Sequence, residues 1–317
     1  AGRVMRTVHL RQAQIPESAH VLTNNHGTAP GFSLQENDCV IAALPGVPGE
    51  FKAMLADHLG DLLAAAGITA KRRHERELRI FGITESALQE RLSSLPGHAD
   101  VKVRSLPRFP EIALRISADE DALLSRFIDE ARDALGWRMY SEQPGESHPE
   151  AVVRTLQTLP ATLAVAESCT GGLLGDLLTD VPGVSQTLIA DLVCYANEAK
   201  VGLLGVDPAV LESHGAVSEA TVIAMAQGAR KVTSADFSVA TSGIAGPGGG
   251  NEDRPVGTIW MAVSGPQGTE AYQGFFPGLD RRRFKLLVAH GALARLRTAA
   301  RTAYALQGDS LDSSSSK

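Results

Sequence analysis

The stretch AESCTGG, near the middle of the chain, places two candidate nucleophiles side by side, Ser168 and Cys169. A serine or cysteine can attack a carbonyl carbon when a neighbouring base takes its proton. Ser168 ends an apolar run and precedes Thr170, Gly171 and Gly172, so backbone N–H groups of a helix start could stabilise an oxyanion beside it. The same position also suits a serine that only caps the helix. Cys169 competes as nucleophile, although free cysteines are more often small buried apolar residues.

A base for this nucleophile has to come from another part of the sequence. Lys200, in VCYANEAK, can act as the base if burial lowers its pKa, as in Ser–Lys variants of the catalytic triad. Tyr195 could orient such a pair, but a helical lysine is more often a solvated surface charge. His214 and His290 have no neighbouring acidic pattern, and we interpret them as structural or solvated imidazoles. From the residues alone, a Ser–Lys pair and a Ser–His–acid triad both stay open.

Two further segments are typical of anion binding. The loop TSGIAGPGGGNEDRPVG (241–257) contains six glycines and two prolines. Its backbone N–H groups can form a nest for an anion, and Thr241 and Ser242 add hydroxyl donors. A cationic cluster opens the last predicted helix: Arg281, Arg282, Arg283 and Lys285. Cations at this end oppose the helix dipole, which favours a bound phosphate or carboxylate; the alternatives are a flexible loop and a solvated helix face.

Alternating strands and helices have to position these residues. The apolar run 162–168 predicts a strand that leads into the loop of Ser168, and residues 237–250 predict a strand followed by the glycine loop. Residues 257–276 predict a hairpin, and a basic amphipathic helix closes the chain. With the helices between them, these elements predict an α/β/α sandwich with a mixed sheet.

The first half of the chain predicts two smaller α/β regions. One has the order strand–helix–strand–strand–helix and is a small α+β domain. The other holds a short buried strand, CVIAAL, then a Gly/Pro loop and a helix from about Glu50 to Ala66. SEQPGESHPE is typical of a linker, and the low-complexity tail is expected to be disordered. The predicted boundaries are residues 1–66, 67–140, 141–150 for the linker, 151–308 for the sandwich and 309–317 for the tail.

Composition narrows the function classes. The chain has 317 residues, and its net charge of −6 argues against a mainly electrostatic binder of nucleic acid or membrane. The sequence contains no run of about 18 apolar residues, so no membrane helix is predicted. The N-terminus lacks the long apolar core of a signal peptide. The three cysteines are widely spaced, so neither a disulfide framework nor a zinc site is predicted. A cytoplasmic location fits these features.

Six motifs in order resemble the C-terminal domain of the CinA (competence/damage-inducible protein) family: AESCTGG, VCYANEAK, HGAVSE, TSGIAGPGGG, PVGT and FPG followed by DR. The stand-alone version of this domain is the nicotinamide-nucleotide amidase PncC. The resemblance spans roughly residues 146–306. QAQIPESAHVLTNNHGTAPGF and LPGVPGEFKAML resemble the end of the family's N-terminal domain, which has a molybdopterin-binding-like fold. Residues 68–140 would then be the KH-like domain between the two.

The resemblance implies deamidation of nicotinamide mononucleotide to nicotinate mononucleotide and ammonia. The family's Ser–Lys pair falls on Ser168 and Lys200, and its tyrosine falls on Tyr195. The implied substrate-binding residues are Thr170, Gly171, Gly172, Asn197, Thr241, Ser242, Gly243, Gly246, Gly248 and Arg281. An extra Leu279 within the FPG-DR motif could displace Arg281 and bring Arg282 into its place. Glu167 also matches a family position.

The resemblance also sets expectations for cofactors and partners. The amidase domain needs no metal or cofactor, whereas the family's N-terminal domain is associated with ADP-ribose pyrophosphatase activity and a divalent metal. The early glycine- and aspartate-rich motifs of that domain are missing, so we expect no pyrophosphatase activity. We expect a homodimer that binds a small nucleotide and no membrane. KRRHERELR (71–79) lacks a G-x-x-G clamp, so nucleic-acid binding is not expected. The alternative is a pyrophosphatase-associated or competence-linked binding protein without amidase activity.

Overall fold

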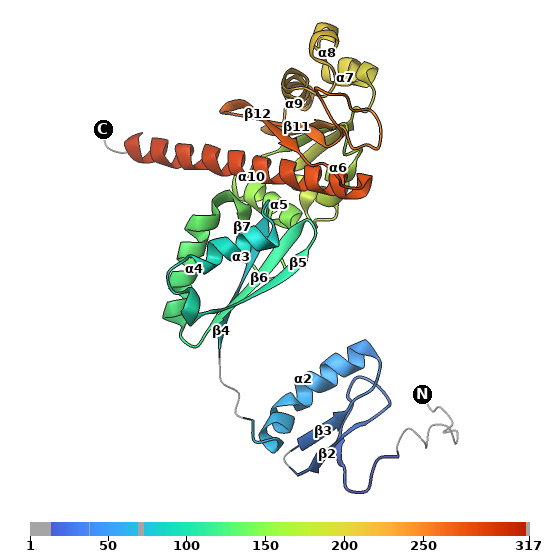
Figure 1. The fold of residues 1–317 in the computed structure, drawn as a ribbon, viewed down its shortest axis with the longest axis vertical. Helices are drawn as coiled ribbons and strands as arrows, with labels where there is room; N and C mark the ends of the chain where they lie inside the picture. Colours follow the sequence, from blue (N-terminus) through green and yellow to red (C-terminus); the bar gives the residue numbers. More distant parts are fainter. Residues whose placement is uncertain (1–13, 38, 69–72, 315–317) are drawn as a thin grey trace. The chain divides into compact units, whose positions relative to one another are not determined.

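The computed structural model describes residues 14–37, 39–68 and 73–314. The chain divides into two compact units, residues 1–72 and residues 73–317 (Figure 1). Parts of the predicted first domain (1–13), of the predicted α+β domain (69–72) and of the predicted tail (315–317) lie outside the described residues. Within the described ranges, no helix has the length and apolar character needed to cross a membrane.

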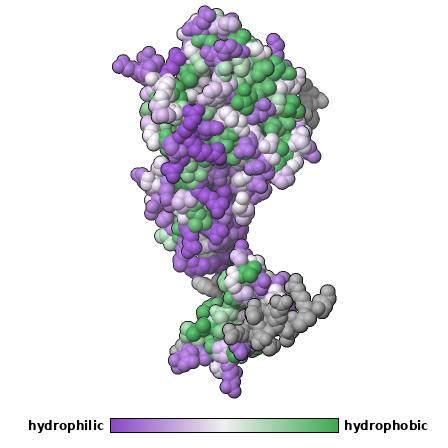
Figure 2. Space-filling view, turned by 90° about the vertical axis from the view of Figure 1, so that its right-hand side faces the viewer, coloured by the Kyte–Doolittle hydropathy of each residue, from purple (hydrophilic) through white to green (hydrophobic). Residues whose placement is uncertain are grey.

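The N-terminal unit is a three-stranded antiparallel sheet with one helix. Its elements are β1 (His20–Leu22), β2 (Gly31–Glu36), β3 (Cys39–Ala43) and α2 (Pro48–Ala65). The strand of CVIAAL is present, but the prediction that it is buried was wrong, because Ile41 is 52% exposed. A single helix covers this small sheet, so apolar side chains remain at the surface of this unit, where Figure 2 shows them in green.

The second unit begins with a small α+β domain. Its elements are β4 (His74–Phe81), α3 (Glu85–Ser93), β5 (Lys102–Arg108), β6 (Glu111–Ala118), α4 (Asp121–Leu135) and β7 (Met139–Ser141), with short 3-10 turns at His98–Asp100 and Gly136–Arg138. The strands lie in the order β5-β6-β4-β7, and every pair is antiparallel. Alternate residues such as Leu78, Ile80 and Leu114 are buried, together with apolar residues of the two helices. The predicted order of elements is confirmed, with β7 added.

The rest of the unit is built on a five-stranded mixed sheet with the order β12-β11-β10-β8-β9. Its strands are β8 (Leu163–Glu167), β9 (Leu188–Val193), β10 (Phe237–Gly243), β11 (Thr258–Gly265) and β12 (Gly268–Phe275). β8 pairs in parallel with both β9 and β10, whereas β11 and β12 form the predicted antiparallel hairpin. β8 therefore lies inside the sheet, and its carboxyl end points to the loop that carries Ser168.

Helices cover both faces of this sheet, which confirms the predicted α/β/α sandwich. One apolar core contains residues of α5 (His148–Thr158), α6 (Leu173–Thr179) and α10 (Arg281–Ser314). A second core contains residues of α7 (Asn197–Leu204), α8 (Pro208–His214) and α9 (Glu219–Thr233). A short 3-10 turn, Val184–Gln186, precedes β9. In Figure 1, α10 runs along the sandwich as one long helix.

Two segments differ from the sequence prediction. The predicted linker 141–150 is partly regular structure, because Ser141 ends β7 and α5 begins at His148. Ser147 and Glu150 form a capping box that fixes this helix start, and a capping box needs only local hydrogen bonds. At the other end of the chain, α10 continues to Ser314, whereas the composition of residues 309–317 predicted disorder.

Candidate active site

Ser168 directly follows β8 and remains hydrogen-bonded to the next strand. Its backbone N–H donates to the carbonyl oxygen of Thr241 at 3.1 Å, and the residue is 9% exposed. In parallel α/β sheets, ligands bind at the carboxyl ends of the strands. Ser168 therefore stands where such a sheet usually holds its functional groups, with its backbone fixed by the strand pairing.

Lys200 is the direct neighbour of this hydroxyl. The side chain comes from α7, is 1% exposed, and places its Nζ 3.3 Å from Ser168 Oγ. The same Nζ donates to the carbonyl oxygens of Cys194 and Tyr195, each at 3.0 Å. The two predicted partners, thirty-two positions apart in the sequence, are thus brought into contact.

Burial lowers the pKa of Lys200, although the nearby Cys194, Cys169 and Glu198 act in the opposite direction. A neutral lysine has two N–H donors and one lone pair. With the two carbonyl oxygens accepting the two N–H groups, the lone pair is left to face Ser168 Oγ. This geometry suits an amine that accepts the serine proton.

Cys169 is buried near this pair rather than exposed as a nucleophile. It is 5% exposed and packs in the apolar core beneath the sheet. Burial, together with the charge of Glu167, raises the pKa of the Cys169 thiol to about 12. Because only the thiolate is a strong nucleophile, Cys169 acts as a small apolar residue at neutral pH.

The turn after Ser168 requires glycine. Gly171 and Gly172 have φ values of +60° and +88°, in the left-handed region where a side chain would be strained. Gly172 is the N-cap of α6, and its N–H donates to Glu167 Oε2 at 2.9 Å. The N–H groups of Thr170 and Gly171 have no acceptor among the described residues, so these two remain available for an oxyanion.

Glu167 is the residue whose role the sequence did not reveal. It is fully buried, and besides Gly172 it accepts the N–H of Gly175 at 2.8 Å. Asp191 on β9 lies next to it; burial, the charge of Glu167 and a hydrogen bond to Glu167 raise the pKa of Asp191 to about 7. A side chain at Gly175 would collide with the Asp191 carboxylate. The match of Glu167 to a family position was the only signal for this buried carboxyl pair.

Three predicted binding residues instead use their hydroxyls within the protein. Thr170 Oγ1 and Thr241 Oγ1 share a hydrogen bond of 2.8 Å, and both residues are fully buried. Ser242 Oγ donates to the carbonyl oxygen of Ala216 at 2.7 Å. The Thr170–Thr241 bond links the loop after β8 to β10, and the Ser242 bond links β10 to the segment before α9, so these hydroxyls are engaged within the protein.

Arg281 forms a bridge between the glycine loop and the segment before α7. Its Nη1 donates to the carbonyl oxygen of Gly246 at 3.0 Å, and its Nη2 donates to Tyr195 Oη at 2.9 Å. Tyr195 is 61% exposed. The extra Leu279 packs partly buried against the core and does not displace Arg281. Arg282 is exposed, and its side chain forms no hydrogen bond or ion pair with the described residues.

The remaining predicted residues lie around the same rim. Gly243 ends β10, where an added Cβ would lie 3.3 Å from Cys169 Sγ. Gly246 has φ +72°, and space is open around Gly248. Asn197 is exposed at the start of α7. The ammonium group of Lys285 lies 3.5 Å from the position that a Cβ on Gly171 would occupy, which adds a positive charge beside the turn.

No histidine takes part in this arrangement. Among the described residues, no hydrogen bond joins Ser168 to a histidine: His214 is exposed at the end of α8, and His290 contacts His148 and Glu111. The structure therefore favours the Ser–Lys alternative over the triad. Fold and site together define a multidomain α/β protein with a buried serine–lysine pair beside a cationic, glycine-rich rim.

Comparison with known proteins gives the family. The family described as CinA C-terminal domain matches residues 145–300, and the damage-inducible protein CinA KH domain matches residues 75–141. A CinA-like protein of Desulfosudis oleivorans is 41% identical, over 93% of this chain and 73% of that protein. A putative competence-damage inducible protein of Symbiobacterium thermophilum is also 41% identical, over 93% and 73% of the two chains. The chain belongs to the CinA family.

The solved structures that are similar to this chain include the competence/damage inducible protein CihA from Agrobacterium tumefaciens. It is 35% identical, covers 49% of this chain and 97% of its own, and has a TM-score of 0.47.

Proposed function

We propose that this chain hydrolyses the carboxamide of nicotinamide mononucleotide to nicotinate mononucleotide and ammonia. The observation that carries the proposal is the 3.3 Å contact between the buried Lys200 Nζ and Ser168 Oγ. Membership of the CinA family, whose C-terminal domain resembles a nicotinamide-nucleotide amidase, supports the choice of reaction.

In the proposed reaction, Ser168 Oγ attacks the carboxamide carbon while neutral Lys200 takes the hydroxyl proton. The oxyanion would accept hydrogen bonds from the free N–H groups of Thr170 and Gly171. When the C–N bond breaks, Lys200 returns the proton to the departing ammonia. Water then hydrolyses the acyl ester on Ser168, with Lys200 again as the base.

The cationic rim supplies the proposed phosphate site. Arg281 and Lys285 lie at the start of α10, and the guanidinium of Arg281 is oriented by Tyr195 Oη and the carbonyl of Gly246. Arginine is well suited to phosphate because its planar group donates several parallel hydrogen bonds. The cytoplasmic location and the homodimer remain predictions.

Product analysis of the purified chain tests this function. Nicotinamide mononucleotide should give equal amounts of ammonia and nicotinate mononucleotide. Nicotinamide riboside, which lacks the phosphate, should react with a kcat/KM about 10–100-fold lower, as expected for the loss of a charge-assisted contact. A folded chain that releases no ammonia from the mononucleotide would contradict the amidase function and favour the competence-linked binding protein. Equal kcat/KM values for the two compounds would contradict the phosphate site alone.

A further inference from the structure

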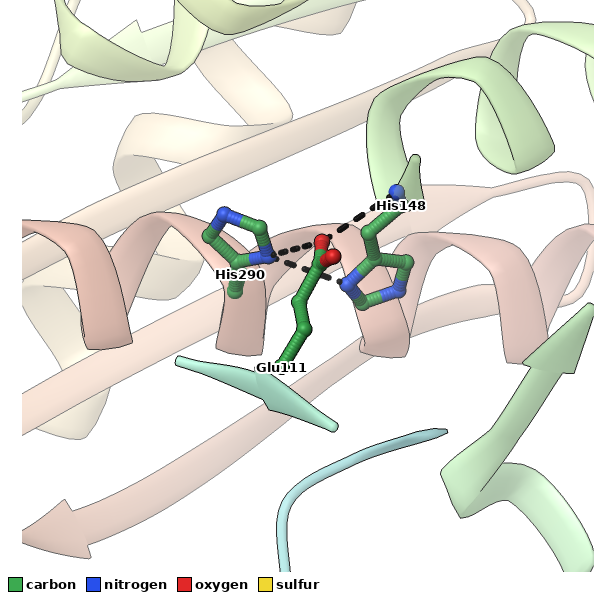
Figure 3. Close-up of side chains that lie close together, drawn as sticks. All are labelled: Glu111, His148 and His290. Atoms are coloured by element: carbon green, nitrogen blue, oxygen red, sulfur yellow. Dashed lines mark hydrogen bonds and ion pairs between the residues drawn. The ribbon is translucent and has the colours of Figure 1, made fainter. Parts of the chain in front are cut away.

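Three buried side chains from distant parts of the second unit converge away from Ser168 and Lys200. Glu111 is the first residue of β6 in the KH-like domain, His148 begins α5, and His290 lies in α10. All three are less than 9% exposed. Figure 3 shows the carboxylate of Glu111 between the two imidazole rings.

The Glu111 carboxylate is held in a fixed orientation. Its Oε2 accepts hydrogen bonds from Tyr140 Oη at 2.9 Å and from Arg79 Nη2 at 3.0 Å. Its Oε1 points to the histidines: it accepts a long 3.3 Å hydrogen bond from the backbone N–H of His148, and His290 Nδ1 also lies 3.3 Å from it. One lone pair of Oε1 is therefore left facing the imidazoles.

Packing also fixes the two rings. The His148 ring stacks on Tyr140 with a centroid separation of 4.4 Å, and Phe81 lies against both rings, with centroids 5.3 and 5.7 Å away. In this arrangement both histidines turn Nδ1 inward (Figure 3). His148 Nδ1 and His290 Nδ1 are 3.3 Å apart, and His290 Nδ1 is 3.3 Å from Glu111 Oε1.

Protons alone satisfy this arrangement poorly. If His290 Nδ1 carries a proton, it has two acceptors in front of it, and His148 must then be protonated at Nε2. His148 Nε2 is buried without a hydrogen-bond partner among the described residues, and an unpaired buried donor is destabilising. If His148 Nδ1 carries the proton instead, the lone pair of His290 Nδ1 faces a lone pair of Glu111.

Two of the three separations between these ligand atoms match a different occupant. A tetrahedral Zn²⁺ with ligand bonds of about 2.0–2.1 Å separates its ligand atoms by about 3.3–3.4 Å. The two measured separations are each 3.3 Å, and the three ligand atoms lie within 4.8 Å of one another. We propose that Glu111, His148 and His290 form a binding site for one divalent transition metal of the zinc type.

The donor set selects this class of ion. Two imidazole nitrogens and one carboxylate oxygen suit Zn²⁺ or Co²⁺, whereas Mg²⁺ and Ca²⁺ prefer ligand sets made of oxygen. A metal of this class binds the lone pair of a neutral imidazole, and both rings turn Nδ1 inward. With three protein ligands, a water molecule would complete the tetrahedral coordination.

The site would join two domains. Glu111 belongs to the segment that matches the KH domain, and both histidines belong to the segment that matches the CinA C-terminal domain. A bound metal would therefore cross-link β6 to α5 and α10 and stabilise the second unit. This role does not depend on the proposed amidase chemistry. The sequence did not predict the site, because the two histidines and the glutamate do not have the spacing of a known metal-binding motif.

Metal content of the untagged full-length chain tests the proposal. Because the site is buried, the protein should be produced in medium supplemented with Zn²⁺ or, separately, Co²⁺, and then dialysed. We expect one equivalent of metal and, with Co²⁺, the intense visible absorption of a four-coordinate site. His290→Gln and Glu111→Gln should each lose that equivalent, and removal of Zn²⁺ by a chelator should lower the Tm.

Two variants serve as controls. Tyr140→Phe keeps the stacked ring but removes one hydrogen bond to Glu111, so the metal affinity should fall about 10–100-fold without loss of the fold. His214→Ala removes an exposed histidine and should retain the full equivalent. A folded wild-type chain with no more zinc than His290→Gln would overturn the proposal, and so would an unchanged Zn²⁺ affinity in Tyr140→Phe.

Discussion

At the scale of single residues, the proposed chemistry depends on the proton between Ser168 and Lys200. The two carbonyl oxygens that accept the N–H groups of Lys200 leave its lone pair facing the Ser168 hydroxyl. Burial lowers the pKa of Lys200 and so favours the neutral amine. A buried lysine without a carboxylate partner is unusual, because burial penalises its charge. Groups with perturbed pKa values cluster at functional sites.

Replacement of Lys200 by methionine should lower kcat by about 10²–10⁴-fold, the contribution typical of a general acid–base group. Methionine retains much of the apolar stem, so the chain should still fold. Lys231→Met, at an exposed position of α9, is the matched control and should keep the wild-type kcat. Steady-state ammonia release measures both, and a fully active Lys200→Met would remove the lysine from the mechanism.

The pH dependence of kcat/KM tests the role of Lys200 as the base. The base must be neutral, so kcat/KM should rise with pH and level off once Lys200 is deprotonated. Because burial lowers the pKa of Lys200, this limb should end below the ordinary lysine range. If a partly active Lys200 variant shows the same rise of kcat/KM with pH, another titrating group causes that rise.

The two adjacent arginines give a direct comparison at this scale. Arg281 contacts Tyr195 and Gly246, whereas Arg282 is exposed. Arg281→Ala should lower kcat/KM for nicotinamide mononucleotide about 10–100-fold, which corresponds to the loss of a hydrogen bond to a charged group. Arg282→Ala should change it less than about twofold. With nicotinamide riboside the Arg281 effect should largely vanish, and an equal loss with both compounds would argue against phosphate binding.

At the scale of elements, the turn between β8 and α6 organises the site. Glu167 ends the strand and accepts two N–H groups of the helix start, and a carboxylate there is favoured by the helix dipole. The left-handed glycines let the chain reverse directly after Ser168. The serine is thus positioned from both sides, by the sheet before it and by the anchored helix after it.

Gly172→Ala should lower the free energy of unfolding by about 1–2 kcal/mol, because the left-handed conformation strains a side chain. The control is the same substitution at Gly202 in α7, which has open space around it and lies in a helix. There alanine should raise the free energy of unfolding by roughly 0.5–1 kcal/mol. Denaturant unfolding distinguishes the two signs, and equal effects would contradict the assigned strain.

Asp191 should make stability depend on pH. Its pKa of about 7 in the folded chain lies above its ordinary value, so between about pH 4 and 7 the folded state holds a proton that the unfolded state has lost. The free energy of unfolding should therefore fall as the pH rises through this window. Asp191→Asn should remove this slope and stabilise the protein at pH 8 by on the order of 1–2 kcal/mol, discounted for partial solvent exposure. Parallel pH curves for the two proteins would contradict a protonated Asp191.

At the scale of the whole molecule, the hydrophobic period and the order of elements in the sequence were enough to predict the sandwich and the small α+β domain, which the family resemblance identified as KH-like. Apolar periodicity located β8 and the hairpin of β11 and β12 because local patterns determine such elements. The contact of Lys200 with Ser168, the burial of Glu167 and the meeting of His148 with Glu111 could not be predicted this way. The contacts of Lys200 and of His148 depend on packing between segments that are far apart in the sequence. The burial of Glu167 goes with hydrogen bonds to backbone N–H groups.

The most direct test of the central claim compares ammonia release from nicotinamide mononucleotide by the wild type, Ser168→Ala and Cys169→Ser. The two variants change neighbouring residues by single atoms, so each serves as the structural control for the other. The account predicts a fall of at least about 10³-fold in kcat for Ser168→Ala, as for loss of a catalytic nucleophile, and near wild-type turnover for Cys169→Ser. Full turnover by Ser168→Ala, or its loss only in Cys169→Ser, would contradict the account.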